Sequence, residues 1–454
     1  MADPDLWGHV RFGLDIIRDR ALTSVDPYSF TQDVPWVNHE WLSEVAMGLA
    51  FEVAGSVGLM VLKALLAAAT CALVARALWH VADIVRWPAL ALFVWCSLSI
   101  AWMLRPQLWT LLLFAALCLI LTSKRHLFAV PFLFVVWVNV HGGWVVGLGV
   151  LVVWSACQIV EPAGQRPSLA VLGIVAVLSV AATLLNPYGW HLWEFIASTV
   201  RMSRVDIVEW APVWRQSYGK TAQWICGMSF FAIVWWRRGR PALPVLAVVA
   251  MLAYASFTVS RLVPLFIEAT VLLLAPLLPV ATSETAAPRA RTIADVAVLV
   301  IGVVTSLVIG VIPRCVAIEG LADPDVVAAE ALKASGGRGR VVTWFNWGEY
   351  AIWHLSPNFK VGTDGRRETV YSMRTLQEQY DIAFGRQEGF QVLERIKPEY
   401  VWLSYKFSRP TAEWLRGHGY RIDIDTPLSF VAVRSDLPRV YPKAVTPTMC
   451  FPGP

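Results

Sequence analysis

The stretch SLAVLGIVAVLSVAATLL at residues 168–185 decides what kind of protein this chain is, because it contains no charged side chain. A helix needs about 20 apolar residues to cross about 30 Å of hydrocarbon. Residues 88–104 (PALALFVWCSLSIAWML) have the same character, and residues 293–312 carry a single carboxylate. The sequence therefore predicts membrane-spanning helices.

The composition of the whole chain agrees with this. Of 454 residues, 57% are apolar and 16% are charged, which is too little polar surface for a water-soluble globule of this size. The net charge of +5 is small, and Lys and Arg lie mostly at the ends of the apolar runs. We therefore expect no nucleic acid partner, because binding nucleic acid needs a basic stripe.

Apolar periodicity predicts about ten spans within residues 43–312, after an amphipathic stretch from Glu40 to Val53. The loop 186–220 is longer than the others, and WHLWEFIASTV inside it predicts a helix lying in the membrane interface. The expected spans are residues 57–79, 88–104, 107–122, 127–140, 144–160, 168–185, 221–236, 241–258, 262–281 and 293–312.

The orientation follows from the loops that carry Lys and Arg. These cations fall on alternate loops, most densely in RRGR at 237–240, and such loops are cytoplasmic. Residues 1–42 and everything after residue 312 are then extracytoplasmic. A polar outer segment normally follows a membrane helix, and none precedes Met1, so we expect a first transmembrane helix to be missing from this chain.

Residues 313–454 have an ordinary charge density and predict one small α/β domain. Cys315 and Cys450 flank it, and an outer location would allow a disulfide that closes the domain. The domain organisation is thus an outer loop (1–42), a transmembrane domain (43–312) and an extracytoplasmic domain (313–454). The expected strands are 340–345, 359–364, 400–405, 420–425 and 428–434, and the expected helices are 325–335, 373–384 and 411–419.

Reactive side chains are densest in the outer loop. On a helix starting at Asp5, the side chains of Asp5 and His9 would lie on one face. The alternative is that Asp3 or Asp5 caps a helix N-terminus and that the other charges are solvated. The candidate residues of this segment are Asp3, Asp5, His9, Arg11, His39 and Glu40.

Three cations lie near the outer ends of expected spans, where the charge bias leaves few others: Lys63, Arg105 and Arg261. A half-buried cation in a membrane protein needs a partner, either a carboxylate or a phosphate. We expect Arg105 and Arg261 to approach one another around a shared anion. His141 either lines the same cavity or is an interface residue. Glu209 is expected to be a solvated loop acid, with a contact to the acceptor or the donor as the alternative.

Two further groups have competing interpretations. Trp7, Trp36 and Trp41 in the outer loop are expected sugar contacts, because carbohydrate rings stack on indole. Asp364, Arg366 and Arg367 follow an expected strand and predict a surface salt-bridge group, or else an acceptor-binding site.

The order of several short motifs is similar to bacterial membrane proteins of the GT-C glycosyltransferase superfamily. The motifs are DPDLWGHVRFG, DPYSFT, WVNHEWLSE, LRPQLWT, NVHGGWVVG, LLNPYGWHLWEF and EWAP, with FNWGEYAIWHL and TDGRRE in the C-terminal domain. That superfamily includes oligosaccharyltransferases, protein O-mannosyltransferases and the aminoarabinose transferase of lipid A. The resemblance implies a polytopic helical GT-C fold in the bacterial inner membrane.

The resemblance also implies an inverting transfer from a polyprenyl-phosphate sugar to an envelope glycan, lipid or protein on the outer face. In the superfamily an acidic residue of the first outer loop is catalytic, a position that Asp5 would occupy, with Asp3 beside it and Glu40 as the next candidate. The expected substrate-binding residues are His9, Arg11, His39, Lys63, Arg105, His141 and Arg261. Some members use a metal and others do not, so a Mg²⁺ or Mn²⁺ requirement stays open.

Two alternatives remain. One is a lipid or anion transporter, against which we find no repeat symmetry and no ionisable residue at mid-membrane depth. The other is a non-catalytic membrane scaffold whose outer domain binds an envelope partner. The sugar, the acceptor and the lipid carrier are not predicted.

Overall fold

The computed structural model describes residues 2–101, 103–200, 202, 207–279, 315–318, 324–445 and 450–453. The expected span at 293–312 lies outside these residues. The chain divides into two compact units, one formed by Met1–Leu59 with Pro313–Pro454 and the other by Met60–Ile312. Each unit is described by itself below.

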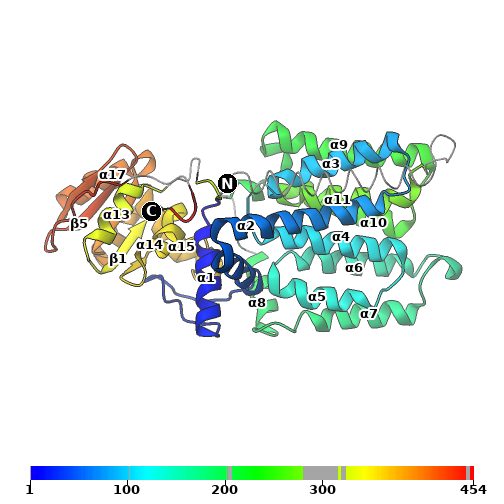
Figure 1. The fold of residues 1–454 in the computed structure, drawn as a ribbon, viewed down its shortest axis with the longest axis horizontal. Coiled ribbons are helices and arrows are strands. Elements are labelled where there is room, and N and C mark those ends of the chain that lie inside the picture. Colours follow the sequence, from blue (N-terminus) through cyan, green and yellow to red (C-terminus); the bar gives the residue numbers. More distant parts are fainter. Residues whose placement is uncertain are drawn as a thin grey trace. The chain divides into compact units, whose positions relative to one another are not determined.

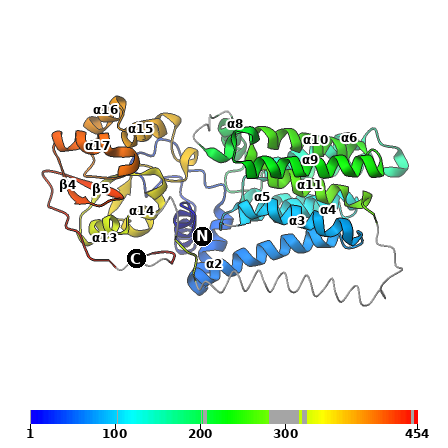
Figure 2. The same ribbon diagram turned by 90° about the horizontal axis from the view of Figure 1, so that it is seen from above.

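The second unit is built of apolar helices that run side by side (Figures 1 and 2). Every span expected within the described residues is a helix, because these apolar runs are long and consist mostly of good helix formers. The helices are α2 (Trp41–Ala77, which begins in the first unit), α3 (Asp83–Ala101), α4 (Gln107–Ser123), α5 (Ala129–Val140), α6 (Trp144–Gln158), α7 (Leu169–Ala182), α9 (Tyr218–Arg238), α10 (Leu243–Thr258) and α11 (Val263–Leu274).

Two of these segments are long and apolar enough to cross a membrane, Trp41–Ala77 and Ser260–Leu277, and five shorter helices are also apolar. Helix α2 is kinked at Ala54 and Gly55, where Gly55 has φ +56°, a conformation that favours glycine. The kink separates the expected amphipathic stretch from the expected first span. The predicted interfacial segment also contains a helix, α8 (His191–Val200).

The first unit contains a five-stranded sheet of order β2-β1-β3-β5-β4. Strand β1 pairs in parallel with β2 and β3, and β5 pairs antiparallel with β3 and β4. Figure 2 shows the sheet between α13 and α14 on one side and α15 to α17 on the other. The strands are β1 (Gly339–Thr343), β2 (Phe359–Val361), β3 (Tyr400–Ser404), β4 (Tyr420–Asp425) and β5 (Ser429–Arg434).

The predicted α/β domain is therefore confirmed, with two helices more than expected. Helices α14 and α16 are short, and α14 is buried over most of its length, so its sequence shows no amphipathic pattern. The helices are α13 (Val326–Ala334), α14 (Gly348–Leu355), α15 (Met373–Ala383), α16 (Gln387–Ile396) and α17 (Tyr405–Gly417).

The opening segment, residues 1–42, is more than the loop that we had expected. It contains α1 (Leu6–Asp19), which buries Leu6, Trp7, Val10 and Phe12 and packs against α14. The amphipathic spacing of these apolar residues explains the helix, because their burial stabilises it where an isolated helix of this length would be marginal.

The segment after α1 extends the sheet. The Val361 amide donates to the Tyr28 carbonyl at 2.9 Å, and the Phe30 amide donates to the Val361 carbonyl at 3.1 Å. Both backbone groups of Val361 at the β2 edge are thereby satisfied. The opening segment and the C-terminal domain thus share one core.

The two ends of the C-terminal domain are joined, since Cys315 and Cys450 form the predicted disulfide. The residues after Cys450 return to α1. The Phe451 ring lies 5.4 Å from that of Trp7, and the Pro452 carbonyl accepts hydrogen bonds from Trp7 Nε1 at 2.7 Å and from His354 Nε2 at 3.0 Å.

Candidate functional site

Asp5 stands at the head of α1, but its side chain makes no capping hydrogen bond. Asp3 is fully buried, and its Oδ1 accepts the amide of Asp5, the residue just before the helix, at 3.0 Å. The capping interpretation is therefore wrong for Asp5. The Asp5 carboxylate is directed instead toward a second acid, Glu349 of α14.

Glu349 was not among the expected site residues. It is 3% exposed, and its Oε2 accepts the Gly8 amide at 3.0 Å. Its Oε1 and the Asp5 Oδ1 both approach Gly365, where an added Cβ would lie 2.8 and 2.2 Å from them. Burial raises the pKa of Glu349 well above its usual range, and the negative charges of Asp5 and Asp364 raise it further. A single acid in the apolar run GEYAIWHL is the signal that would have identified it.

His9 lies one turn after Asp5, as the spacing predicted. Its Nδ1 donates to Glu44 Oε1 at 3.1 Å, and Asn38 Nδ2 donates to the other oxygen of Glu44 at 2.5 Å. Burial alone would lower the pKa of His9, but the bond to Glu44 and the charges of Glu44, Glu40 and Asp5 outweigh it and raise the pKa to about 9. A protonated imidazole therefore stands beside Asp5 at neutral pH.

The remaining candidates of this segment face other partners. Arg11 donates to Asp15 at 2.8 Å, and Asp15 also pairs with Arg18 at 2.7 Å and accepts the Tyr28 hydroxyl. His39 and Glu40 form a longer pair, 3.6 Å apart, just before α2. The charge of Arg11 is thus neutralised locally.

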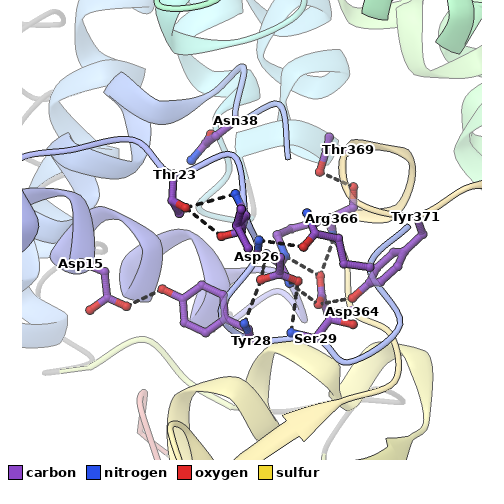
Figure 3. A network of polar contacts seen from close by, with 12 residues as sticks. Asp15, Thr23, Asp26, Tyr28, Ser29, Asn38, Asp364, Arg366, Thr369 and Tyr371 are labelled. Atoms are coloured by element: carbon purple, nitrogen blue, oxygen red, sulfur yellow. Dashed lines mark hydrogen bonds and ion pairs between the residues drawn. The ribbon is translucent and has the colours of Figure 1, made fainter. Parts of the chain in front are cut away.

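Arg366 forms the buried centre of the first unit (Figure 3). Its guanidinium binds Asp364 at 2.7 and 2.8 Å and Asp26 at 2.8 Å through two parallel bonds. Tyr371 donates to Asp364 at 2.7 Å. The guanidinium also lies over three rings, those of Phe12, Tyr28 and Trp36.

This network corrects two expectations. The side chains of Asp364 and Arg366 are 0% and 5% exposed, so they are a core ion pair and not a surface group. Trp7 and Trp36 are also buried, which excludes stacking on a sugar. The network instead fixes the loop that carries Gly365, the residue against which Asp5 and Glu349 lie.

In the second unit, Arg105 and Arg261 share Glu209. Arg105 Nη1 lies 3.7 Å from one oxygen of Glu209, and Arg261 Nη1 lies 4.0 Å from the other. Ser260 Oγ donates to the Glu209 carbonyl at 3.0 Å, which holds this loop near Arg261. The two cations approach one another as expected, and Glu209, whose side chain is 50% exposed, is solvated as predicted although it also lies beside both of them. The three side chains carry a net charge of about +1 at neutral pH.

His141 follows α5, and its Nδ1 lies within hydrogen-bond distance of two groups. Its Nδ1 accepts the Gly143 amide at 3.0 Å and is 2.7 Å from Thr110 Oγ1, which itself accepts Trp137 Nε1 at 2.9 Å. A nitrogen that accepts carries no proton, so Nε2 of the neutral ring bears it and is a donor. Lys63 lies half-buried on α2.

Glu268 on α11 contradicts our statement that no ionisable residue lies at mid-span. It is fully buried, and neither carboxyl oxygen finds a hydrogen-bond partner among the described residues. Such a residue within an apolar span is uncommon and often functional.

A divalent cation finds no prepared site in the described parts of the chain, which hold no group of three His, Cys, Asp or Glu side chains placed to bind one.

Comparisons with known proteins agree with this fold. No family model and no curated protein matches the sequence. The oligosaccharyltransferase of Archaeoglobus fulgidus matches in its apo form over 96% of this chain and 71% of its own, with 11% identity and a TM-score of 0.53. The archaeal oligosaccharyltransferase AglB from the same organism, in complex with an inhibitory peptide and a dolichol-phosphate, matches over the same shares with 12% identity and a TM-score of 0.55.

The arabinofuranosyltransferase AftD from Mycobacteria matches over 96% of this chain but only 38% of its own, with 15% identity and a TM-score of 0.51. This chain thus spans less than half the length of AftD. Both enzymes are GT-C glycosyltransferases, and the chain has the GT-C fold.

Proposed function

We propose that this chain transfers a sugar from a polyprenyl-phosphate donor to an acceptor hydroxyl or amide on the extracytoplasmic side of a membrane. The observation that carries the proposal is the Asp5 carboxylate, which heads α1 without capping it and stands beside a protonated His9. An acid that stabilises its own helix would have turned to the free amides.

The surface of the second unit supports a membrane location. Phe132, Val177 and Trp236 are 74%, 68% and 79% exposed, on helices that would otherwise bury such side chains. Apolar surface of this extent needs lipid around it. The Cys315–Cys450 disulfide supports an oxidising, outer location for the C-terminal domain, and hence the multi-pass topology with that domain outside.

The proposed chemistry is an inverting displacement at the anomeric carbon. Asp5 takes the proton of the acceptor nucleophile as the new bond to the anomeric carbon forms. The bond from that carbon to the phosphate oxygen breaks, and the lipid phosphate leaves with the electron pair. Arg105 and Arg261, with Lys63 second, stabilise the phosphate charge. The AglB complex with a dolichol-phosphate supports a lipid-phosphate carrier.

The test is the Asp5→Asn variant of the full chain, reconstituted and supplied with radiolabelled polyprenyl-phosphate sugars and envelope extracts. We expect a loss of transfer of about 10²–10⁴-fold, the usual size of a general-base contribution, at unchanged melting temperature. Asp19→Asn is the matched control, because Asp19 lies at the other end of α1 and is largely exposed. Equal transfer by Asp5→Asn and the unmutated protein refutes the assignment.

Transport remains a second candidate, because Glu268 is a buried acid on a predicted span and its carboxyl oxygens find no hydrogen-bond partner among the described residues. A proteoliposome assay that follows movement of the lipid or the anion separates the two. Transport activity that is lost in Glu268→Gln and kept in Asp5→Asn would favour the transporter.

A further inference from the structure

Two glycines create the space that Glu349 occupies. An added Cβ at Gly8 would lie 2.1 Å from Glu349 Oε2, and one at Gly365 would lie 2.8 Å from Oε1. Neither distance is possible between real atoms, so any larger residue at these positions would displace the carboxyl group. Because the Gly8 amide also donates to Oε2 at 3.0 Å, the Glu349 carboxyl group is held in one orientation.

The same carboxyl group faces Asp5. The Asp5 Oδ1 and the Glu349 Oε1 both touch the Gly365 position and lie within about 5 Å of each other. Oε2 of Glu349 is occupied by the Gly8 amide, while Oε1 takes no hydrogen bond from the described residues. Oε1 is therefore the atom that faces Asp5.

We propose that Glu349 is a positioning residue for Asp5: held by Gly8 and Gly365, its carboxyl group fixes the direction of the Asp5 carboxylate toward the acceptor. This rests on the proposed role of Asp5.

Electrostatic repulsion decides whether Glu349 is protonated or ionised. Two ionised carboxylates this close, with one of them buried, repel one another, and the pair relieves this by keeping one proton. Glu349 is the more buried of the two, and burial favours its protonated form. A protonated Oε1 donates toward Asp5, which stays ionised and able to accept the proton of the nucleophile.

This assignment predicts that two substitutions of Glu349 differ in their effect on the transfer rate. Glu349→Gln keeps a neutral donor of the same shape, so we expect its transfer rate to stay within about threefold of the unmutated protein and its pH–rate profile to keep its shape. Glu349→Leu removes the donor, and we expect a loss of about 10²-fold, the size of effect that a misplaced catalytic group produces. A Glu349→Gln variant as impaired as Glu349→Leu would overturn the proposal, and so would a fully active Glu349→Leu.

Gly365, beside which the carboxyl groups of Asp5 and Glu349 both lie, supplies a second variant. Gly365→Ala should push the two carboxyl groups apart and reduce transfer to the level of Glu349→Leu, while Gly417→Ala, at a position with nothing within 4 Å, should leave it unchanged. Equal transfer by the two alanine variants overturns the proposal even if Glu349→Leu fails to fold.

An infrared measurement on the full chain needs no activity and separates this proposal from the proposed function. The unmutated protein minus Glu349→Gln difference spectrum at pH 7 should show the carbonyl stretch of a protonated carboxylic acid. Its absence overturns the role of Glu349 whatever Asp5 does. Its presence together with an active Asp5→Asn variant refutes the catalytic role of Asp5, and with it the positioning role of Glu349.

Discussion

The Arg366 guanidinium donates two parallel hydrogen bonds of 2.8 Å to the carboxylate of Asp26, which lies 340 positions earlier in the chain. The same guanidinium binds Asp364, so one cation pairs with two fully buried carboxylates. Their cost of burial is offset only while the guanidinium is present. This contact ties the segment after α1 to the loop of the C-terminal domain that carries Gly365.

The first prediction concerns that cation. Arg366→Met should destabilise the first unit by about 3–5 kcal/mol, because it leaves two buried carboxylates without a partner. The loss should appear as a lower melting temperature and faster proteolysis of the C-terminal domain. Arg374→Met is the control, since Arg374 is 79% exposed and should change stability by less than about 0.5 kcal/mol. Similar melting temperatures for the two variants would contradict the buried network.

This relationship also marks the limit of prediction from the sequence. The helices of the second unit were predictable because uncharged runs such as residues 168–185 carry a strong local signal. The strands were predictable because the short apolar runs lie between turns. Nothing local distinguishes a buried Arg366 from a surface one, because its burial depends on Asp26.

The candidate site was likewise predicted only in part. Asp5 and His9 were named from their four-residue spacing and from the family resemblance. Glu349 was missed because its significance comes from Gly8, 341 positions away. Glu209 is solvated as predicted, but its pairing with Arg105 and Arg261 was not predicted because these arginines lie on separate turns between expected spans.

The second prediction follows from the raised pKa of His9. Since this pKa is raised from 6.5 to about 9 in the folded protein, the stabilisation by His9 is fully present below pH 6.5 and is lost as the pH rises through about 9. The unmutated protein should therefore lose more melting temperature between pH 6.5 and 9.5 than His9→Gln does. Parallel curves for the two proteins would show that the histidine is not held in its charged form.

The third prediction tests the disulfide and the topology together. With Cys315 and Cys450 oxidised, five free cysteines remain among the described residues out of seven in the chain. Denatured, unreduced protein should thus take up five maleimide groups, and reduced protein seven. Cys315→Ser with Cys450→Ser should lower stability by about 2–5 kcal/mol, given the long loop that the bond closes. Seven accessible thiols without reductant would contradict both the disulfide and the outer location.

The last prediction concerns the donor phosphate and the shared anion in the second unit. Arg105 and Arg261 hold Glu209 at 3.7 and 4.0 Å, distances longer than a tight ion pair. A phosphate with more charge and more acceptor oxygens would compete well for both guanidinium groups. Arg105→Gln and Arg261→Gln should each weaken binding of a short-chain polyprenyl phosphate about 10-fold or more, since a hydrogen bond to a charged group contributes about 1.5–3 kcal/mol.

The Glu209→Gln variant distinguishes a phosphate-binding site from a purely structural ion pair. If Glu209 occupies the place of the phosphate, Glu209→Gln removes the competing anion and should strengthen phosphate binding severalfold while the arginine variants weaken it. If the three residues form only a structural ion pair, all three variants should lower the melting temperature and none should change phosphate affinity. Arg240→Gln, at an exposed loop position, controls for the loss of one positive charge. Titration calorimetry with the short-chain polyprenyl phosphate in the same lipid nanodiscs measures all four variants, and opposite signs for Glu209→Gln and Arg261→Gln are the expected result.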